Sequence, residues 1–285
     1  MQKQLKRIYE KGSTHWVGDG FHVRNLFPSN GLEDEVSPFL MLDYAGPTVF
    51  PPGKPRGVGE HPHRGFETVT IAYQGSIAHR DSGGHAGVIH PGDVQWMTAA
   101  SGVVHEEKQE AEFARLGGAL EMVQLWVNLP KAYKMSPPRY QPLVKEQIPT
   151  VDFDGGSLRV IAGEYGGSKG PASTFTPVNL FDLRLQAGGR AELDLPDGFN
   201  SAVALLKGDV LINGRDELAG EARIAVFGSA GTEVTLEARR ESTLLVLNGE
   251  PILEPVASYG PFVMNTEREI RQALDDYRAG RMGHL

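Results

Sequence analysis

The chain contains no cysteine among its 285 residues. Disulfide bonds and thiolate metal ligands are therefore excluded, and the absence fits a reducing cytoplasm, where we expect the protein to reside. No apolar run approaches the roughly 20 residues that span a bilayer, so we expect no membrane segment. Lys and Arg number 28 against 36 Asp and Glu, a formal net charge of −8. This balance argues against direct, phosphate-driven binding of nucleic acid, and leaves a protein partner open.

Glycine and proline, in contrast, are abundant and spread along the chain, with 35 glycines and 19 prolines. Many short strands joined by tight turns require this composition, so we expect an all-β fold. Two series of strands are predicted, separated by a proline-rich, mostly polar stretch at 128–150 that we interpret as a linker. The first series covers 21–27, 38–44, 67–73, 76–80, 87–90, 94–99 and 118–127. The second covers 158–164, 179–185, 190–195, 201–207, 209–212, 222–227, 233–237 and 242–248.

The two series have similar spacing, which predicts two barrels of one design, in a domain 1–135 and a domain 136–285. In the second barrel, Lys207-Gly208-Asp209 and Asn213-Gly214 are predicted as hairpin turns. A capping box at Thr266-Glu267-Arg268-Glu269, followed by apolar residues at helical spacing, predicts one helix at 266–279. We expect this helix to pack against a barrel and assign it no chemistry.

Candidate metal ligands lie between residues 61 and 107. Side chains alternate faces along a strand, so His61, His63 and Glu67 are expected to share one face, and His105 and Glu107 to share a face of a second strand. The pair His61 and His63, facing the pair His105 and Glu107, supplies three imidazoles and a carboxylate. That set suits a divalent first-row metal with positions left open for water or substrate.

The second series lacks the residues for a similar site. Eight of the nine histidines lie at or before residue 105, and the ninth is His284 in the tail. The strands of the second series carry small and apolar residues instead, such as Ala202, Val203 and Ala204. We therefore expect one metal ion per chain and a packed interior in the second barrel.

The wording of these segments resembles the pirin family of the cupin superfamily. The motifs are HPHRGFETVT at 61–70, HPGDVQWMTAASGVVHEE at 90–107 and VQLWVNLP at 123–130. Further matches are SPFLMLDY at 37–44, KMSPPRYQ at 134–141 and EPVASYGPFVMNT at 254–266. In pirins the residue that matches Glu107 is often followed by Met-Pro, whereas here Lys108-Gln109 follow it. This difference puts the loop after the site in doubt and leaves the ligand in place.

The resemblance implies two tandem cupin domains, which are small antiparallel, jelly-roll-like barrels, with a C-terminal helix. It implies a single divalent metal, with Fe²⁺ first and Mn, Co, Ni, Cu or Zn as alternatives. The ligands would be the residues that match the family's positions, His61, His63, His105 and Glu107. Glu67 would then be an outer acceptor that holds a ligand imidazole by its ring N–H, whereas in many other cupins the matching residue is itself a ligand.

For activity, the resemblance to bacterial pirins implies quercetin 2,3-dioxygenase: opening of a flavonol ring by O₂ with loss of carbon monoxide. The substrate would be a flavonol-like small molecule, and Glu107 would accept its 3-OH proton. Mammalian pirins resemble transcriptional co-regulators, which implies an alternative of another class, a non-enzymatic, metal-sensing protein that binds a protein partner. Turnover of quercetin discriminates the two.

Other polar residues near the candidate ligands are not expected to bind the metal. Glu106 alternates away from Glu107 and is expected to face solvent or a partner loop. His79, His85 and His90 lie in a turn-rich stretch and are expected at the surface.

Overall fold

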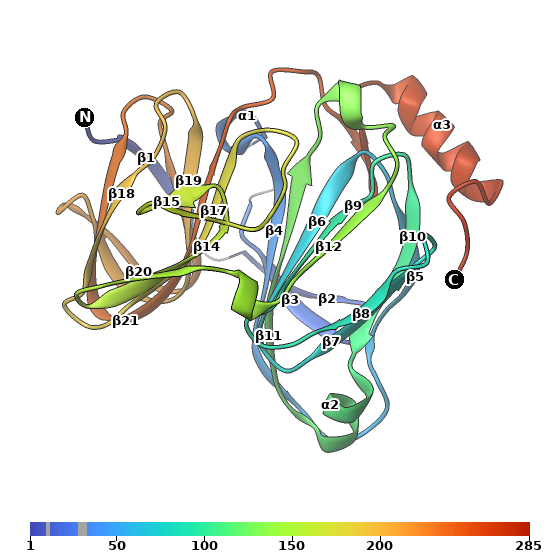
Figure 1. The fold of residues 1–285 in the computed structure, drawn as a ribbon, viewed down its shortest axis with the longest axis horizontal. Coiled ribbons are helices and arrows are strands. Elements are labelled where there is room, and N and C mark those ends of the chain that lie inside the picture. Colours follow the sequence, from blue (N-terminus) through green and yellow to red (C-terminus); the bar gives the residue numbers. More distant parts are fainter. Residues whose placement is uncertain (10–11, 28–32) are drawn as a thin grey trace. The chain divides into compact units, whose positions relative to one another are not determined.

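The computed structural model describes residues 1–9, 12–27 and 33–285 (Figure 1). By contact the chain forms two compact units whose sequences interleave. The histidine unit comprises Thr14–Val23, Leu42–Lys145 and Ile252–Leu285 and holds all nine histidines, while the apolar unit comprises Met1–Ser13, Arg24–Met41 and Glu146–Pro251. Each unit is assembled from three stretches of the sequence. The predicted division into domains 1–135 and 136–285 is not tested by these units and stays a prediction.

Two sheets form the framework of the histidine unit. A seven-stranded sheet has the order β12-β9-β6-β11-β4-β3-β2, and a four-stranded sheet has the order β5-β10-β7-β8. The strands of the first are β2 (Thr14–Val17), β3 (Phe21–Asn25), β4 (Phe39–Phe50), β6 (Phe66–Gln74), β9 (Val94–Thr98), β11 (Gly118–Asn128) and β12 (Arg139–Leu143). Those of the second are β5 (Gly57–His63), β7 (Ile77–Asp81), β8 (Ala86–Ile89) and β10 (Val103–Gln109). β6 and β10 each pair antiparallel with both neighbours, so the predicted all-β fold is confirmed.

The stretch 128–150 is not the linker that its prolines suggested. β12 lies within it and pairs along its whole length with β9, from Arg139 opposite Thr98 to Leu143 opposite Val94. Pro142 is tolerated because β12 is an edge strand, where a missing N–H need not break a ladder. Short 3₁₀ helices at Lys131–Tyr133 and Lys145–Gln147 flank it.

The apolar unit contains one eight-stranded sheet of order β1-β20-β19-β21-β17-β14-β13, with β18 paired to β21. The strands are β1 (Leu5–Tyr9), β13 (Thr150–Phe153), β14 (Gly156–Ala162), β17 (Val178–Leu185), β18 (Arg190–Asp194), β19 (Asn200–Ile212), β20 (Asp216–Phe227) and β21 (Glu233–Gly249). A small hairpin of β15 (Glu164–Tyr165) and β16 (Ser168–Lys169) lies outside this sheet.

The interior of the apolar unit is filled by aliphatic and aromatic side chains, as expected for the second barrel. β18 shows the pattern most simply: Ala191 and Leu193 are buried, and Arg190, Glu192 and Asp194 are exposed. Leu205, Leu236 and Leu244 from longer strands are fully buried in the same cluster. Burial of each such leucine contributes about 1.5–3 kcal/mol to folding.

One of the two predicted hairpin turns is confirmed and the other is wrong. Asn213 and Gly214 have φ of 51° and 69°, as a tight turn between β19 and β20 requires. Gly208 lies inside β19 instead, at φ 128°, where the pairing with β21 shifts register. The glycine marks a bulge in one long strand.

The predicted C-terminal helix is confirmed as α3 (Glu267–Arg278). The Thr266 hydroxyl accepts a hydrogen bond from the Glu269 backbone N–H, and the Glu269 carboxylate accepts one from the Asn265 N–H. Ile270 and Ala273 pack on β22 (Ala257–Tyr259), β23 (Phe262–Met264) and Val104 of β10. Two shorter helices, α1 (Glu33–Val36) and α2 (Ala111–Leu116), were not predicted.

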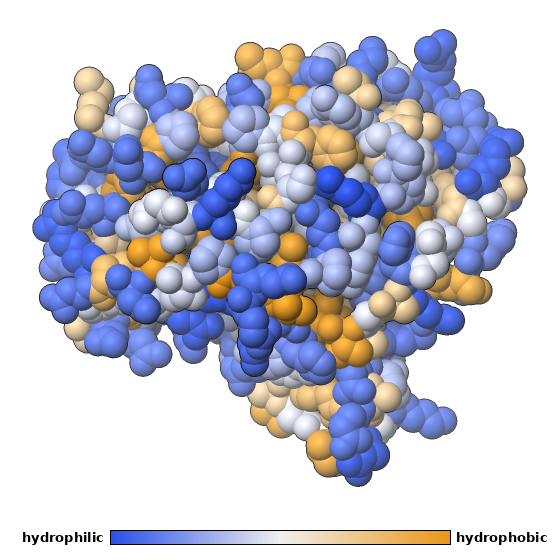
Figure 2. All heavy atoms as spheres, in the orientation of Figure 1, coloured by the Kyte–Doolittle hydropathy of each residue, from blue (hydrophilic) through white to orange (hydrophobic). Residues whose placement is uncertain are grey.

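No helix among the described residues has the length and hydrophobicity that crossing a membrane requires. On the face shown in Figure 2, hydrophilic side chains predominate and hydrophobic ones form separate groups.

Candidate metal centre

Three histidines of the four-stranded sheet converge on one point. His61 and His63 lie on the same face of β5, and His105 of β10 is the cross-strand partner of His61. The ring centroids of His61 and His105 are 4.2 Å apart, and those of His63 lie 4.8 Å from each of the other two. One ligand nitrogen from each residue lies within 4.8 Å of the others. The predicted convergence of these side chains is therefore present in the fold.

The chemistry of this donor set fits a metal ion. His63 Nδ1 and both ring nitrogens of His105 are buried and have no hydrogen-bond partner. Burial, followed by the neighbouring imidazoles, lowers the pKa of His63 and His105 well below the usual 6.5, so both rings are neutral and offer lone pairs. A buried polar atom without a partner costs about 1–3 kcal/mol, which a ligated ion would offset.

His61 is oriented by its own strand. Its Nδ1 lies 2.8 Å from the Gly59 carbonyl oxygen, and a proton on Nδ1 donates to that carbonyl. The lone pair of Nε2 is then left for a metal. A ligand imidazole held through its other nitrogen is the usual arrangement in protein metal sites.

Glu107 is buried on β10, two residues after His105, and its carboxylate is held by hydrogen bonds to other side chains. Its Oε1 accepts a hydrogen bond from Thr70 Oγ1 at 3.2 Å, and its Oε2 accepts one from Gln124 Nε2 at 2.8 Å. Glu107 follows His105 at the alternation of β10, which pairs without a break with β7 here, but the ligand group found among the described residues holds the three histidines and not Glu107. Its roles as fourth ligand and as base stay predictions.

The prediction that Glu67 shares a face with His61 and His63 is wrong, so the structure supports neither role considered for it, ligand or acceptor for a ligand imidazole. Gly65, at φ 89°, breaks the strand after His63, so His63 and Glu67 belong to different sheets. Along β6, Glu67 is an odd number of residues from Thr70, which bonds Glu107, and therefore faces the opposite side. There its Oε1 accepts a hydrogen bond from Thr98 Oγ1 at 2.7 Å.

His79 is buried, which contradicts the surface position expected for it. It lies opposite Glu107 on β7, its ring centroid is 5.4 Å from that of His105, and it stacks on Tyr140 at 5.3 Å. Ile77 and Asp81 are buried with it, but the sequence IAHRD does not show this alternation, because Ala78 is apolar and the buried Asp81 is charged. Burial lowers the pKa of His79, while Glu107 and Asp81 act in the opposite direction.

The other two histidines of that stretch are exposed as predicted, and Glu106 points away from the site. His85 stacks on Tyr140 at its exposed end, and His90 contacts Ser76. Glu106 bonds Arg80 and Lys108, each at 2.6 Å.

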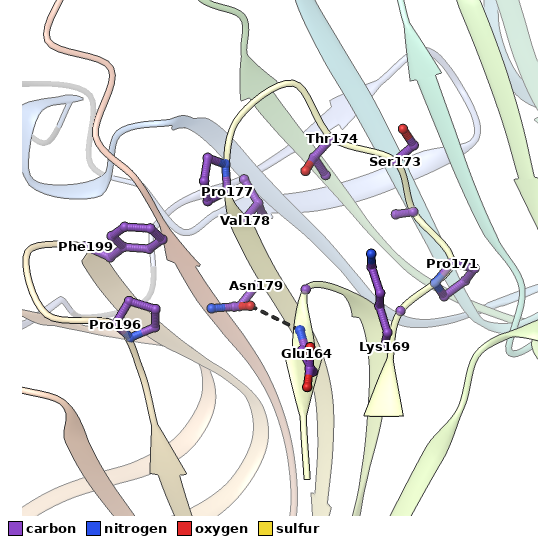
Figure 3. A pocket seen from close by; sticks show the side chains of 13 residues that line it. Glu164, Lys169, Pro171, Ser173, Thr174, Pro177, Val178, Asn179, Pro196 and Phe199 are labelled. Atoms are coloured by element: carbon purple, nitrogen blue, oxygen red, sulfur yellow. Dashed lines mark hydrogen bonds between the residues drawn. The ribbon is translucent and has the colours of Figure 1, made fainter. Parts of the chain in front are cut away.

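The apolar unit carries an open cavity that the sequence did not predict. It has a volume of about 620 Å³ and is lined by Lys169, Asn179, Pro177 and Phe199, among others. Figure 3 shows the Lys169 amine pointing toward the segment of Ser173 and Thr174. The cavity contains no histidine, and Glu164 is the one carboxylate among its lining residues, so it offers no counterpart of the three-histidine group.

Comparison with known proteins agrees with this architecture. Residues 20–127 match the family model described as Pirin, and residues 180–283 match the one described as Pirin C-terminal cupin domain. A Pseudomonas aeruginosa protein named "Putative quercetin 2,3-dioxygenase PA2418" is 53% identical over 98% of this chain and 98% of its own. The fold is therefore two cupin domains with a C-terminal helix, as predicted.

Solved structures show the same relationship. A quercetin 2,3-dioxygenase from Acinetobacter baumannii superposes with a TM-score of 0.96 at 49% identity, over 99% of both chains. The Escherichia coli pirin YhhW, solved in complex with nickel(II), shares the fold with a TM-score of 0.65 at 18% identity, over 86% of this chain and all of its own. From the two family models and these matches, the chain belongs to the pirin family.

Proposed function

We propose that the chain is a metal-dependent quercetin 2,3-dioxygenase. The observation that carries the proposal is the group of three converging imidazoles, in which His63 and His105 are buried and have ring nitrogens without a partner. The names of the P. aeruginosa and A. baumannii relatives support the choice of reaction. Iron is the metal we propose, with nickel, which YhhW binds, among the alternatives.

His61, His63 and His105 would hold the ion, with Glu107 as a fourth ligand. When bound, a divalent transition metal supplies Lewis-acid and redox chemistry for a reaction between a flavonol oxygen and O₂. The reaction needs no further oxidant, because a flavonol and O₂ together balance the ring-opened ester and carbon monoxide.

The chain's own contribution centres on the Glu107 carboxylate. Thr70 and Gln124 each donate a hydrogen bond to one of its oxygens, which fixes the carboxylate in one orientation. A carboxylate held in this way can accept the 3-OH proton of a flavonol. Phe66 and Trp126 pack on the His63 ring, at 5.1 and 5.3 Å between centroids, and exclude water from that side.

A quercetin assay tests the proposal. Protein loaded with iron should consume quercetin and O₂ together, and chelator-treated protein should not. Separate loading with manganese, cobalt, nickel and copper extends the test to the alternative metals. If quercetin is lost no faster than in buffer with any of these ions, the proposed dioxygenase activity is overturned. The alternative, a non-enzymatic, metal-sensing protein that binds a protein partner, would then be the better account of the same ligands.

A further inference from the structure

The C-terminal segment is bonded directly to the end of the metal-binding strand β5. The Arg64 backbone N–H donates to the Pro261 carbonyl at 3.3 Å, and the Val263 N–H donates to the Arg64 carbonyl at 3.0 Å. A Cβ at residue 65 would lie 1.9 Å from the Val263 carbonyl oxygen, so only glycine permits this approach. The segment at 261–263 therefore packs against the residues that follow His63.

The Arg64 side chain connects three parts of the histidine unit. It is 4% exposed, its Nε donates to the Ser101 carbonyl at 2.7 Å, and one terminal nitrogen donates to Asp276 Oδ2 at 2.7 Å. Ser101 lies in the turn that leads into β10, which carries His105, and Asp276 lies on α3. One guanidinium thus joins both ligand-bearing strands to the C-terminal helix.

A second contact reaches β10 from the end of the chain. Ser82 Oγ donates to the Met282 carbonyl at 2.7 Å and accepts from the Val104 N–H at 3.0 Å. Gly102 approaches Met282 so closely that a Cβ there would lie 2.7 Å from the methionine Cγ. Val104 is the residue before His105, so the tail also fixes the second ligand strand.

A buried lysine strengthens the first contact. Lys134 Nζ donates to the Gly65 carbonyl at 2.7 Å, the Val263 carbonyl at 2.9 Å and Asn128 Oδ1 at 2.6 Å. All three donors of the ammonium are used, and two of them join the turn after His63 to the C-terminal segment.

We propose that Arg64 is a positioning residue for the metal centre, through which α3 and the segment 261–282 set the affinity of the site for its ion. The inference rests on the proposed metal centre. A guanidinium can bond two acceptors in a fixed geometry, and an ammonium on a flexible stem cannot replace it across the same span. Coupling between two sites is reciprocal, so ion binding must also stabilise α3.

Metal affinity tests the proposal without reference to catalysis. Co²⁺ would be titrated into metal-free protein in competition with a chelator and followed by its visible absorption. Arg64→Lys and Asp276→Asn should each weaken Co²⁺ binding about 10- to 100-fold, the range for partners that orient ligands, and should change the absorption spectrum. The melting temperature of each metal-free variant shows whether it is folded.

Arg281→Gln is the matched control. Arg281 also bonds Asp276, at 2.7 Å, but its side chain is 57% exposed and has no bond to the ligand strands. Co²⁺ affinity should stay within about fivefold of wild type. If Arg64→Lys and Asp276→Asn bind Co²⁺ as wild type does, or if all three variants weaken it equally, the positioning role is wrong.

Hydrogen exchange on the wild-type protein tests the reciprocal effect and needs no variant. Co²⁺ should slow amide exchange in 267–278 as well as in β5 and β10, and leave β18 of the apolar unit unchanged. Slowing confined to β5 and β10 would overturn the coupling. Failure of quercetin turnover with the Co²⁺ results intact would reject the dioxygenase alone, whereas wild-type protein that does not bind Co²⁺ would remove the metal centre and this inference together.

Discussion

Two strands, one from each unit, use the same alternation for opposite purposes. In β18 the buried positions are Ala191 and Leu193, and exposed charged residues separate them. In β10 the corresponding alternation buries His105, Glu107 and Gln109. The first strand contributes hydrophobic contact, and the second contributes polar atoms that need partners.

The difference shows where function lies in a fold of two similar barrels. The interior of the apolar unit is a continuous cluster of aliphatic and aromatic residues, which stabilises the fold and offers nothing to an ion. The histidine unit places neutral imidazoles with free nitrogens at the same kind of inward positions. Chemistry is therefore a property of the site and not of the barrel.

The largest expected effect is loss of the metal. Wild-type protein should contain close to one ion per chain, because His61, His63 and His105 form the one such ligand group among the described residues. His105→Ala removes a ligand and should lose most of the ion, by elemental analysis of protein purified without chelator. Lys169→Ala, in the cavity of the apolar unit, is the control and should keep the wild-type content. A wild-type stoichiometry near two would break the contrast between the units.

The next effect separates the carboxylate from the imidazoles. Glu107→Gln keeps an oxygen that can accept from Thr70 or Gln124, but an amide cannot take up a flavonol proton near neutral pH. We expect the variant to retain much of its metal and to lose about 10²- to 10⁴-fold in the rate of quercetin consumption. Rate and metal content should be measured on the same samples. An unchanged rate at full loading would contradict the assignment of Glu107 as base.

A core substitution in the apolar unit should act on stability alone. Leu244 is fully buried in the aliphatic cluster, so Leu244→Ala leaves a cavity and should lower the free energy of unfolding by about 2–5 kcal/mol. Denaturant unfolding measures the loss, and elemental analysis of the folded fraction should still give the wild-type metal content. A large loss of metal per folded chain would show that the two units are not independent in function.

Features with local causes could be predicted from the sequence. The capping box of α3, the turn at Asn213-Gly214 and the alternation of β18 each depend on residues within a few positions of one another. That His61 shares a face with His63, and His105 with Glu107, also followed from alternation along β5 and β10. These predictions needed no knowledge of distant contacts.

Features that depend on distant contacts could not be predicted. Gly65 turns the chain because the Val263 carbonyl lies against it, and that contact joins residues nearly 200 positions apart. Gly208 looks like a turn residue, but it lies in a bulge opposite β21. His79 was expected at the surface because it lies in a turn-rich stretch, and the ring that it stacks on, Tyr140, belongs to β12 in the stretch interpreted as a linker.

The buried position of Glu67, away from the metal centre, should have a smaller effect, on the pH dependence of stability. Burial raises the pKa of Glu67 to about 7, against the effect of the Thr98 hydrogen bond. A carboxyl whose folded pKa is raised contributes stability that is fully present below the unfolded value of 4.5 and is lost as pH rises toward 7. Glu67→Gln mimics the protonated form, so above pH 7 it should be more stable than wild type, by at most about 3 kcal/mol.

Wild type and Glu67→Gln should converge in stability near pH 4.5. Urea unfolding of both proteins from pH 5 to pH 8 measures the difference in their free energies of unfolding. Because Glu67 faces away from Thr70 and Glu107, metal content should not change. A variant that loses metal, with no gain in stability at pH 8, would return Glu67 to the metal centre and would contradict the strand break at Gly65 as the reason for its exclusion.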